Sequence, residues 1–419
     1  MINDKLLLHG YSSQFVKLVG LSFIICHLFV FPCEAQTKKA NTVRQDLSQA
    51  RTILKSGRGG DQAERLMTDL LKDSVNREDK RIYAVWYDAV LMQYLAVNEK
   101  LYMKQRQDTA QFLELTRRLF NVAMTLDSLD MRPDKKGRVA PEYRRDHARQ
   151  LSTYRPNLFA AVTYFVRKGD YAKAYDYGET YIGTARQPLF SDLRLDSTDS
   201  RMPEVAYWTT YSGYRQQDAV RTLRYRKLAL RDTSKTEFTL QYMAEARRLL
   251  KDDSLYMETL RMGFSHNPTN TYFFPRLMDY YTAHGDNEAA LDVVDRALEA
   301  DGSSTLYLFA KSTVLFNMGR YDECIALSDS LISMNDSLPD PYYNAGTAYL
   351  NKALKLHPLR QKKQLRQVYQ KARPYMERYR QLAPDQQRKW GPVLYRIYLN
   401  LNMGRQFDEI DQLLKTQRQ

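Results

Sequence analysis

The stretch that decides the fold is His284-Gly285-Asp286-Asn287-Glu288-Ala289-Ala290, because a second version, Met318-Gly319-Arg320-Tyr321-Asp322-Glu323-Cys324, follows 34 residues later. Three consecutive blocks of this length, residues 237–270, 271–304 and 305–338, align without a gap. A fixed period of about 34 residues is typical of repeated helix-turn-helix units. We therefore expect an all-α protein in which antiparallel helix pairs stack on one another.

The period and the two quoted segments resemble the tetratricopeptide repeat (TPR) family. In the amino-terminal half, Gly169-Asp170-Tyr171, followed by Ala174, is similar to the same family pattern. The resemblance covers roughly residues 158 to 414 and implies a right-handed α-solenoid. It also implies a protein-binding scaffold without enzymatic activity of its own.

The chain divides into three parts on these observations. Residues 1–35 have the layout of a signal peptide, residues 36–155 form an amino-terminal helical region of divergent repeats, and residues 156–419 form the TPR array. Residues 203–236 match the period poorly, so we expect a degenerate unit there.

The signal-like segment combines basic residues with a short apolar run. Lys5 and Lys17 precede residues 18–31, and the segment ends at Cys33-Glu34-Ala35 with small residues beside a cleavage after Ala35. We expect export and cleavage, which would leave a soluble periplasmic or envelope-associated protein. An uncleaved membrane anchor is one alternative. Lipidation at Cys33 is another, although bulky Phe and Pro residues precede this cysteine.

The block that begins at Pro339 is interrupted by a basic insertion at about residues 352–371. Its second helix arrives late, because Ala372 takes the position of Cys324 only 48 residues later instead of 34. Insertions in repeat arrays often lie on a binding face. We therefore select Lys362 and Lys363 as candidate partner-binding residues; the alternative is a solvated extension of the helix.

The charge of the chain favours an anionic partner. With 63 Lys and Arg against 49 Asp and Glu, the formal net charge is +14. Acidic protein, anionic lipid and nucleic acid are the three possibilities that charge raises, and export makes nucleic acid unlikely. Of the 3 cysteines, only Cys324 lies beyond the signal segment. It takes the position that Ala290 fills one period earlier, so we expect a small packing residue and no internal disulfide.

The sequence holds no recognisable catalytic, metal-binding or cofactor motif. His-Glu-x-x-His, Cys-x-x-Cys, Gly-x-x-x-x-Gly-Lys-Ser/Thr and Gly-x-Ser-x-Gly are all absent. The histidines beyond residue 35 lie far apart in the sequence. We therefore predict a protein that is not an enzyme and that uses no cofactor or metal.

In TPR proteins the first helix of each unit lines the concave groove, and the resemblance therefore suggests partner-binding positions. The Asn and Thr side chains could hydrogen-bond a peptide backbone, and the aromatic ones could anchor it. The alternative for each residue is ordinary surface or packing between units. The candidates are Tyr272, Asp279, Phe309, Thr313, Asn317, Tyr343, Asn344, Thr347 and Asn351.

Three hypotheses for function result. The first is an exported scaffold that binds a protein or peptide, possibly acidic, in the cell envelope. Any membrane association would then come through the partner or through a lipid on Cys33. The second is a cytoplasmic basic repeat protein that binds nucleic acid, which the net charge alone supports. The third is an accessory carbohydrate-binding subunit.

Overall fold

The protein is an all-α chain that divides into two compact units. The computed structural model describes residues 31–103 and 108–416, and no strand is found in those ranges. Unit 1 ends at Val205 and unit 2 begins at Ala206, within α8 (Met202–Arg215). Residues 1–30, which hold most of the expected signal peptide, lie outside the described residues. None of the helices within the described ranges is long and apolar enough to cross a membrane.

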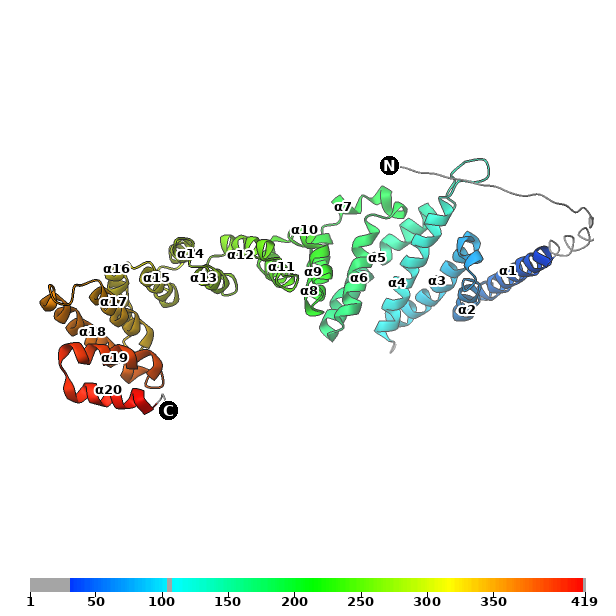
Figure 1. Ribbon diagram of the computed structural model, residues 1–419. Helices are drawn as coiled ribbons and strands as arrows, with labels where there is room; N and C mark the ends of the chain where they lie inside the picture. Colours follow the sequence, from blue (N-terminus) through cyan, green and yellow to red (C-terminus); the bar gives the residue numbers. More distant parts are fainter. Residues whose placement is uncertain (1–30, 104–107, 417–419) are drawn as a thin grey trace, which may run out of the picture. The chain divides into compact units, whose positions relative to one another are not determined.

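Unit 1 is a series of helices in which each, from the first to the sixth, packs against the next (Figure 1). Two 3₁₀ segments, Ser74–Glu78 and Pro188–Leu193, interrupt the series. The α-helices are α1 (Phe31–Lys55), α2 (Gly60–Leu70), α3 (Lys80–Tyr102), α4 (Thr109–Asp130), α5 (Arg144–Lys168), α6 (Tyr171–Thr184) and α7 (Leu195–Thr198).

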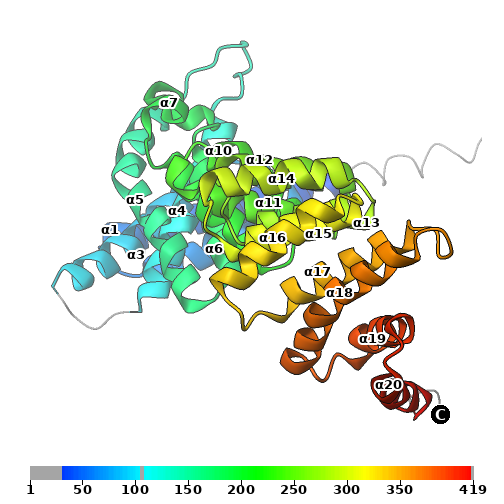
Figure 2. The ribbon, with the colours of Figure 1, turned by 90° about the vertical axis from the view of Figure 1, so that its left-hand side faces the viewer.

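Unit 2 contains the regular repeats, visible as successive helix pairs in Figure 2. After α8 come two short helices, α9 (Ala219–Arg224) and α10 (Arg226–Ala229), and a 3₁₀ turn, Thr233–Lys235. The pairs that follow are α11 (Thr236–Leu249) with α12 (Asp253–His266), α13 (Phe273–Ala283) with α14 (Asn287–Ala300), α15 (Thr305–Asn317) with α16 (Tyr321–Met334), α17 (Pro339–Leu354) with α18 (Lys362–Leu382), and α19 (Gln387–Leu401) with α20 (Gly404–Thr416). The predicted all-α array of helix pairs is confirmed; the right-handed sense of the solenoid stays a prediction.

The turns inside the pairs share one backbone conformation at one repeat position. Gly285 and Gly319 have positive φ angles of 68° and 73°. Lys251 and Gln217, which lie 34 and 68 residues before Gly285, both have φ of 56°. The left-handed conformation follows α8, α11, α13 and α15 and ends each of these helices. The degenerate unit at residues 203–236 therefore keeps the repeat turn although its sequence has lost the glycine.

An aspartate follows each of three of these turns and starts the second helix. The carboxylates of Asp218, Asp252 and Asp286 each accept a hydrogen bond from the backbone N–H three residues later, at 2.9–3.1 Å. This N-cap contact satisfies a donor that the first helical turn leaves free. In the next repeat Arg320 takes this position, and its side chain makes no cap hydrogen bond.

The core of unit 2 follows the predicted repeat positions. Ala290 and Cys324 are both fully buried, as are Leu260, Val294 and Ser328 at the equivalent positions on α12, α14 and α16. Burial raises the pKa of the Cys324 thiol to about 11. The small side chains of Ala290 and Cys324 let neighbouring helices approach closely.

The buried side chains of unit 2 form successive clusters along the chain. An inner cluster runs from Leu240 to Val314. A terminal cluster runs from Tyr342 to Ile410. A small cluster of Leu315, Cys324, Ile325 and Ala348 begins after the inner cluster and overlaps the terminal cluster in sequence.

The expected division between residues 155 and 156 lies inside α5. Pro156 removes one helical hydrogen bond, which costs about 3 kcal/mol in a helix interior. Buried residues on both sides of the proline, Leu151 and Leu158 among them, nevertheless hold the helix together. Between them, Arg155 is 6% exposed, forms an ion pair with Asp199 and lies over the ring of Tyr181. Packing of these buried residues therefore keeps α5 helical across Pro156, although proline by itself disfavours a helix interior.

Candidate functional site

A groove of about 700 Å³ lies at the carboxyl-terminal end of unit 2, and we call it the C-terminal groove. Four helices supply its walls: α17, α18, α19 and α20. Apolar and aromatic side chains make up most of the lining, together with a few polar groups. The lining residues are Leu350, Tyr369, Pro392, Val393, Tyr395, Arg396, Leu399, Asn400, Asp411, Leu414 and Lys415.

Helix α19 is apolar on more than one side, and this creates the groove. Leu394, Ile397 and Tyr398 fill the terminal cluster and are at most 3% exposed. Leu399, by contrast, is 51% exposed and faces the groove. A helix that only closed the array would bury its apolar side and present polar residues elsewhere. The surplus apolar side of α19 is therefore free to contact a partner.

The polar groups at the groove are arranged to favour an anionic ligand. Asp411 is paired with Lys415 at 2.7 Å. Arg396 is exposed, and no ion pair is found for it among the described contacts. Pockets of this size, apolar with a few placed polar groups, are typical of ligand sites. The groove can thus hold apolar side chains and offer Arg396 to a nearby carboxylate.

The structure places two of the predicted groove residues in the interior. Asn344 is 7% exposed, and its amide donates to the hydroxyls of Ser312 at 2.8 Å and Thr313 at 3.2 Å. Thr347 is 6% exposed and donates to the carbonyl oxygen of Tyr343 at 2.6 Å. Asn344 therefore joins α17 to α15, and the hydrogen-bonding groups of both residues are engaged inside the protein.

The other predicted residues are half-buried or exposed. Tyr272 donates to Glu245 at 2.7 Å, and the guanidinium of Arg276 lies 3.7 Å from its ring centre. Tyr343 packs on Tyr379. Phe309 and Asn351 are half-buried, and exposed positions are held by Asp279, Asn317, Lys362 and Lys363. Asn351 donates to the carbonyl oxygen of Thr347 at 3.0 Å, and Thr313 donates to that of Phe309 at 3.1 Å, each within one helix. No described side-chain hydrogen bond joins Tyr272, Asp279, Asn317, Lys362 or Lys363 to another predicted residue.

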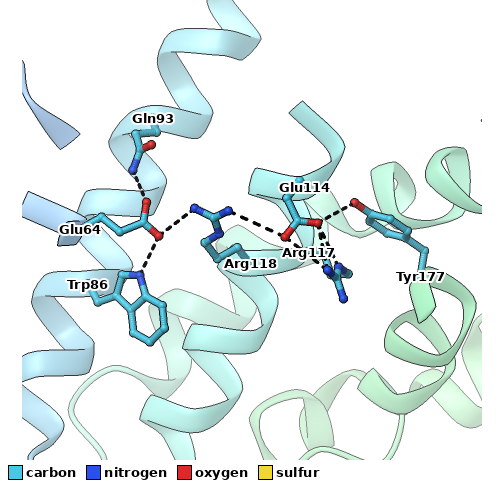
Figure 3. Close-up of polar contacts among 7 residues, drawn as sticks. All are labelled: Glu64, Trp86, Gln93, Glu114, Arg117, Arg118 and Tyr177. Atoms are coloured by element: carbon cyan, nitrogen blue, oxygen red, sulfur yellow. Dashed lines mark hydrogen bonds and ion pairs between the residues drawn. The ribbon is translucent and has the colours of Figure 1, made fainter. Parts of the chain in front are cut away.

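Unit 1 contains a polar network that spans α2, α3, α4 and α6 (Figure 3). The carboxylate of Glu64, 8% exposed, accepts from Trp86 at 3.0 Å, Gln93 at 2.7 Å and Arg118 at 2.9 Å. Arg118 also lies 3.9 Å from Glu114, which accepts from the hydroxyl of Tyr177 at 3.3 Å. Because the hydrogen-bond donors and acceptors of these residues pair with one another, the network links α2, α3, α4 and α6.

The described residues offer no cluster of three or more His, Cys, Asp or Glu side chains that could hold a metal ion. His147, one of the few histidines, stacks on Tyr87 with 3.8 Å between ring centres. Burial lowers the pKa of His147. Its ring is thus a packing element between α3 and α5.

Sequence reasoning found the basic helix α18 but not the groove beside it. Residues 393–399 come from one helix, whereas Leu350 and Leu414 come from helices on either side along the chain. The available signal was the surplus of apolar residues on α19, where Leu399 remains exposed after the core is filled.

No protein-family model and no curated protein matches the chain. Solved structures similar to it include the C-terminal part of a TPR repeat-containing protein from Cytophaga hutchinsonii, with 11% identity and a TM-score of 0.40 over 60% of this chain and 92% of that one. A tetratricopeptide repeat protein from Parabacteroides merdae shows 14% identity and a TM-score of 0.33, over 62% and 92% of the two chains.

A third similar structure, the human IFIT1 dimer with PPP-AAAA, shows 14% identity and a TM-score of 0.32 over 72% of this chain and 67% of that one. Several of the similar structures are thus tetratricopeptide repeat proteins. Identities this low concern the fold alone, and TM-scores below 0.5 add no argument on function.

Proposed function

We propose that the chain is an exported, non-enzymatic scaffold that binds a segment of a protein partner in the C-terminal groove. The observation that carries this proposal is a groove of mixed apolar and polar lining with an exposed arginine, Arg396, at the end of a helical-repeat array. Such a groove suits a segment that presents apolar side chains and at least one carboxylate. Export to the cell envelope is supported by the basic and apolar pattern of residues 1–35.

Site-specific crosslinking in cells tests the binding site. A photo-crosslinking amino acid in place of Leu399 should capture one protein partner. The same amino acid in place of Leu250 is the matched control, because both leucines are 51% exposed and only Leu399 lines the groove. We expect the Arg396→Glu substitution to weaken the adduct at position 399, since it replaces the attracting charge by a repelling one.

Equal adducts at the two positions, or an adduct with nucleic acid instead of protein, would contradict the proposed site. The location is read from the same preparation by mass spectrometry of the amino-terminal peptide. A mature chain that begins at Gln36 supports export, and an intact chain that begins at Met1 in the cytoplasm refutes it.

A further inference from the structure

The α17–α18 hairpin is longer than the pairs before it, and all the extra length lies at one end. In register with α15, helix α17 would end at residue 351, but it continues to Leu354. Helix α16 begins three residues before Cys324, whereas α18 begins ten residues before Ala372, which takes the same position. Seven additional helical residues lengthen a helix by about 10 Å. The end of the hairpin, residues 354–366, is called the hairpin tip below (Figure 2).

The hairpin tip is strongly basic. Residues 352–376 contain no Asp or Glu. At its base, Lys352 pairs with Asp322, and Lys355 lies 4.7 Å from the ring centre of Tyr321. Within the part of the chain that the structure describes, no ion pair is found for Arg360, Lys362, Lys363 or Arg366.

Two leucines are exposed at the same tip. Leu354 is 59% exposed and Leu359 is 84% exposed. Hydrogen bonds fix the conformation of the turn that holds Leu359. The backbone N–H groups of Leu359 and Arg360 donate to Nδ1 of His357, at 3.3 Å and 3.2 Å. The backbone N–H of His357 in turn donates to the side chain of Gln361 at 2.8 Å. The tip therefore presents its leucine in an ordered turn.

We propose that the hairpin tip docks on an anionic lipid surface. Leu359 and Leu354 enter the interface, and the basic side chains that follow Leu359 contact phosphate groups of the lipids. A cluster of lysines and arginines beside apolar side chains is the chemistry that recognises such a surface. A protein partner would need a pocket for Leu359, whereas a convex tip matches a soft planar surface without one. This proposal does not depend on the C-terminal groove.

A fluorescent reporter at the tip tests the proposal in the full-length chain. An environment-sensitive fluorophore is attached through Leu359→Cys, with Cys26 and Cys33 replaced by serine; Cys324 is buried and does not compete. The probes are vesicles of phosphatidylglycerol and phosphatidylethanolamine in equal parts, and vesicles of phosphatidylcholine. We expect a blue shift with the anionic vesicles only. The same label at Leu250→Cys should show no blue shift. Because both labelled chains contain residues 1–35, a membrane contact made by those residues is the same in both.

Charge reversal tests the basic residues with a matched control. Lys362→Glu with Lys363→Glu should raise the lipid concentration for the half-maximal shift about tenfold or more, because each cation adds to the attraction. Lys135→Glu with Lys136→Glu changes the net charge equally on an exposed loop of unit 1 and should leave that concentration unchanged.

Several outcomes would overturn the proposal. They are an equal shift with phosphatidylcholine, an equal effect of the two double variants, and a tip that responds to polyglutamate or RNA but not to vesicles. The last result would assign the tip to an acidic macromolecule.

Discussion

Lys251 holds a left-handed backbone at the position where Gly285 and Gly319 stand in the next two repeats. A side chain in this conformation costs about 1 kcal/mol that glycine avoids. Lys251→Gly should therefore raise the free energy of unfolding of unit 2 by about that amount. Urea denaturation followed by circular dichroism measures it. Gly285→Ala is the reciprocal variant, and a loss of stability in both variants would show that φ is not the deciding factor.

The buried pair of Arg155 and Asp199 predicts a pH effect in unit 1. Burial acts to raise the pKa of Asp199, but hydrogen bonds from Arg155 and Tyr181 outweigh it and lower this pKa below 3.8. Because the folded-state pKa is depressed, the stabilisation is complete above pH 3.8 and is lost as the pH falls through the folded-state pKa.

Asp199→Asn should accordingly cost about 3 kcal/mol at pH 7, since it leaves the guanidinium of Arg155 buried without its charge partner. The difference between this variant and the unsubstituted chain should shrink below pH 3.8. Denaturant midpoints at pH 7 and pH 3 test this. A difference that stays constant with pH would assign the effect to packing instead of charge.

At the scale of helices, the Asn344 side chain joins two successive first helices, α15 and α17. Asn344→Ala should lower the free energy of unfolding by about 1–2 kcal/mol, because it removes buried hydrogen bonds and leaves a void. Asn317→Ala, on the exposed side of α15, should change it by less than about 0.5 kcal/mol. Chemical denaturation of both variants makes the comparison. Equal effects would mean that the link between the helices contributes nothing.

The 34-residue period predicted the helix pairs from α11 to α16, because Gly285 and Gly319 recur at this spacing in two of the three turns. It could not predict that Gln217 and Lys251 keep the same turn, since neither residue favours a positive φ by itself. It also could not predict that α5 runs through Pro156, since buried neighbours on both sides of the proline stabilise the helix. Local signals identify a repeat, but packing decides where it continues.

The candidate site was harder to predict than the fold. A surface assignment by repeat position selected Asn344 and Thr347, which are buried, because it did not consider how α17 packs against α15. The basic insertion was recognised from its composition, and the structure shows it as a lengthening of α17 and α18. The groove depends on which apolar residues of α19 remain after the core is filled, and this requires the positions of three other helices.

At the scale of the molecule, the separate clusters of unit 2 predict local rather than uniform stability. In repeat proteins each unit contacts only its neighbours, so a defect should weaken mainly its own surroundings. Leu277→Ala in the inner cluster and Leu394→Ala in the terminal cluster are matched, because both leucines are fully buried. Each substitution should cost about 2–5 kcal/mol locally.

Hydrogen–deuterium exchange with mass spectrometry measures the local stability of both variants. Leu277→Ala should speed exchange in α11–α14, and Leu394→Ala should speed it in α17–α20. If either substitution speeds exchange equally throughout unit 2, the unit unfolds as a single cooperative body.

The buried thiol of Cys324 can report how often the helices around it open. It lies in the small cluster with Leu315, Ile325 and Ala348, and its raised pKa of about 11 leaves almost no reactive thiolate at neutral pH while the repeat is closed. In a chain without Cys26 and Cys33 it is the only cysteine, so the rate of alkylation counts each opening of α15, α16 and α17. A partner that closes this region would lengthen the lifetime of the free thiol without any engineered label.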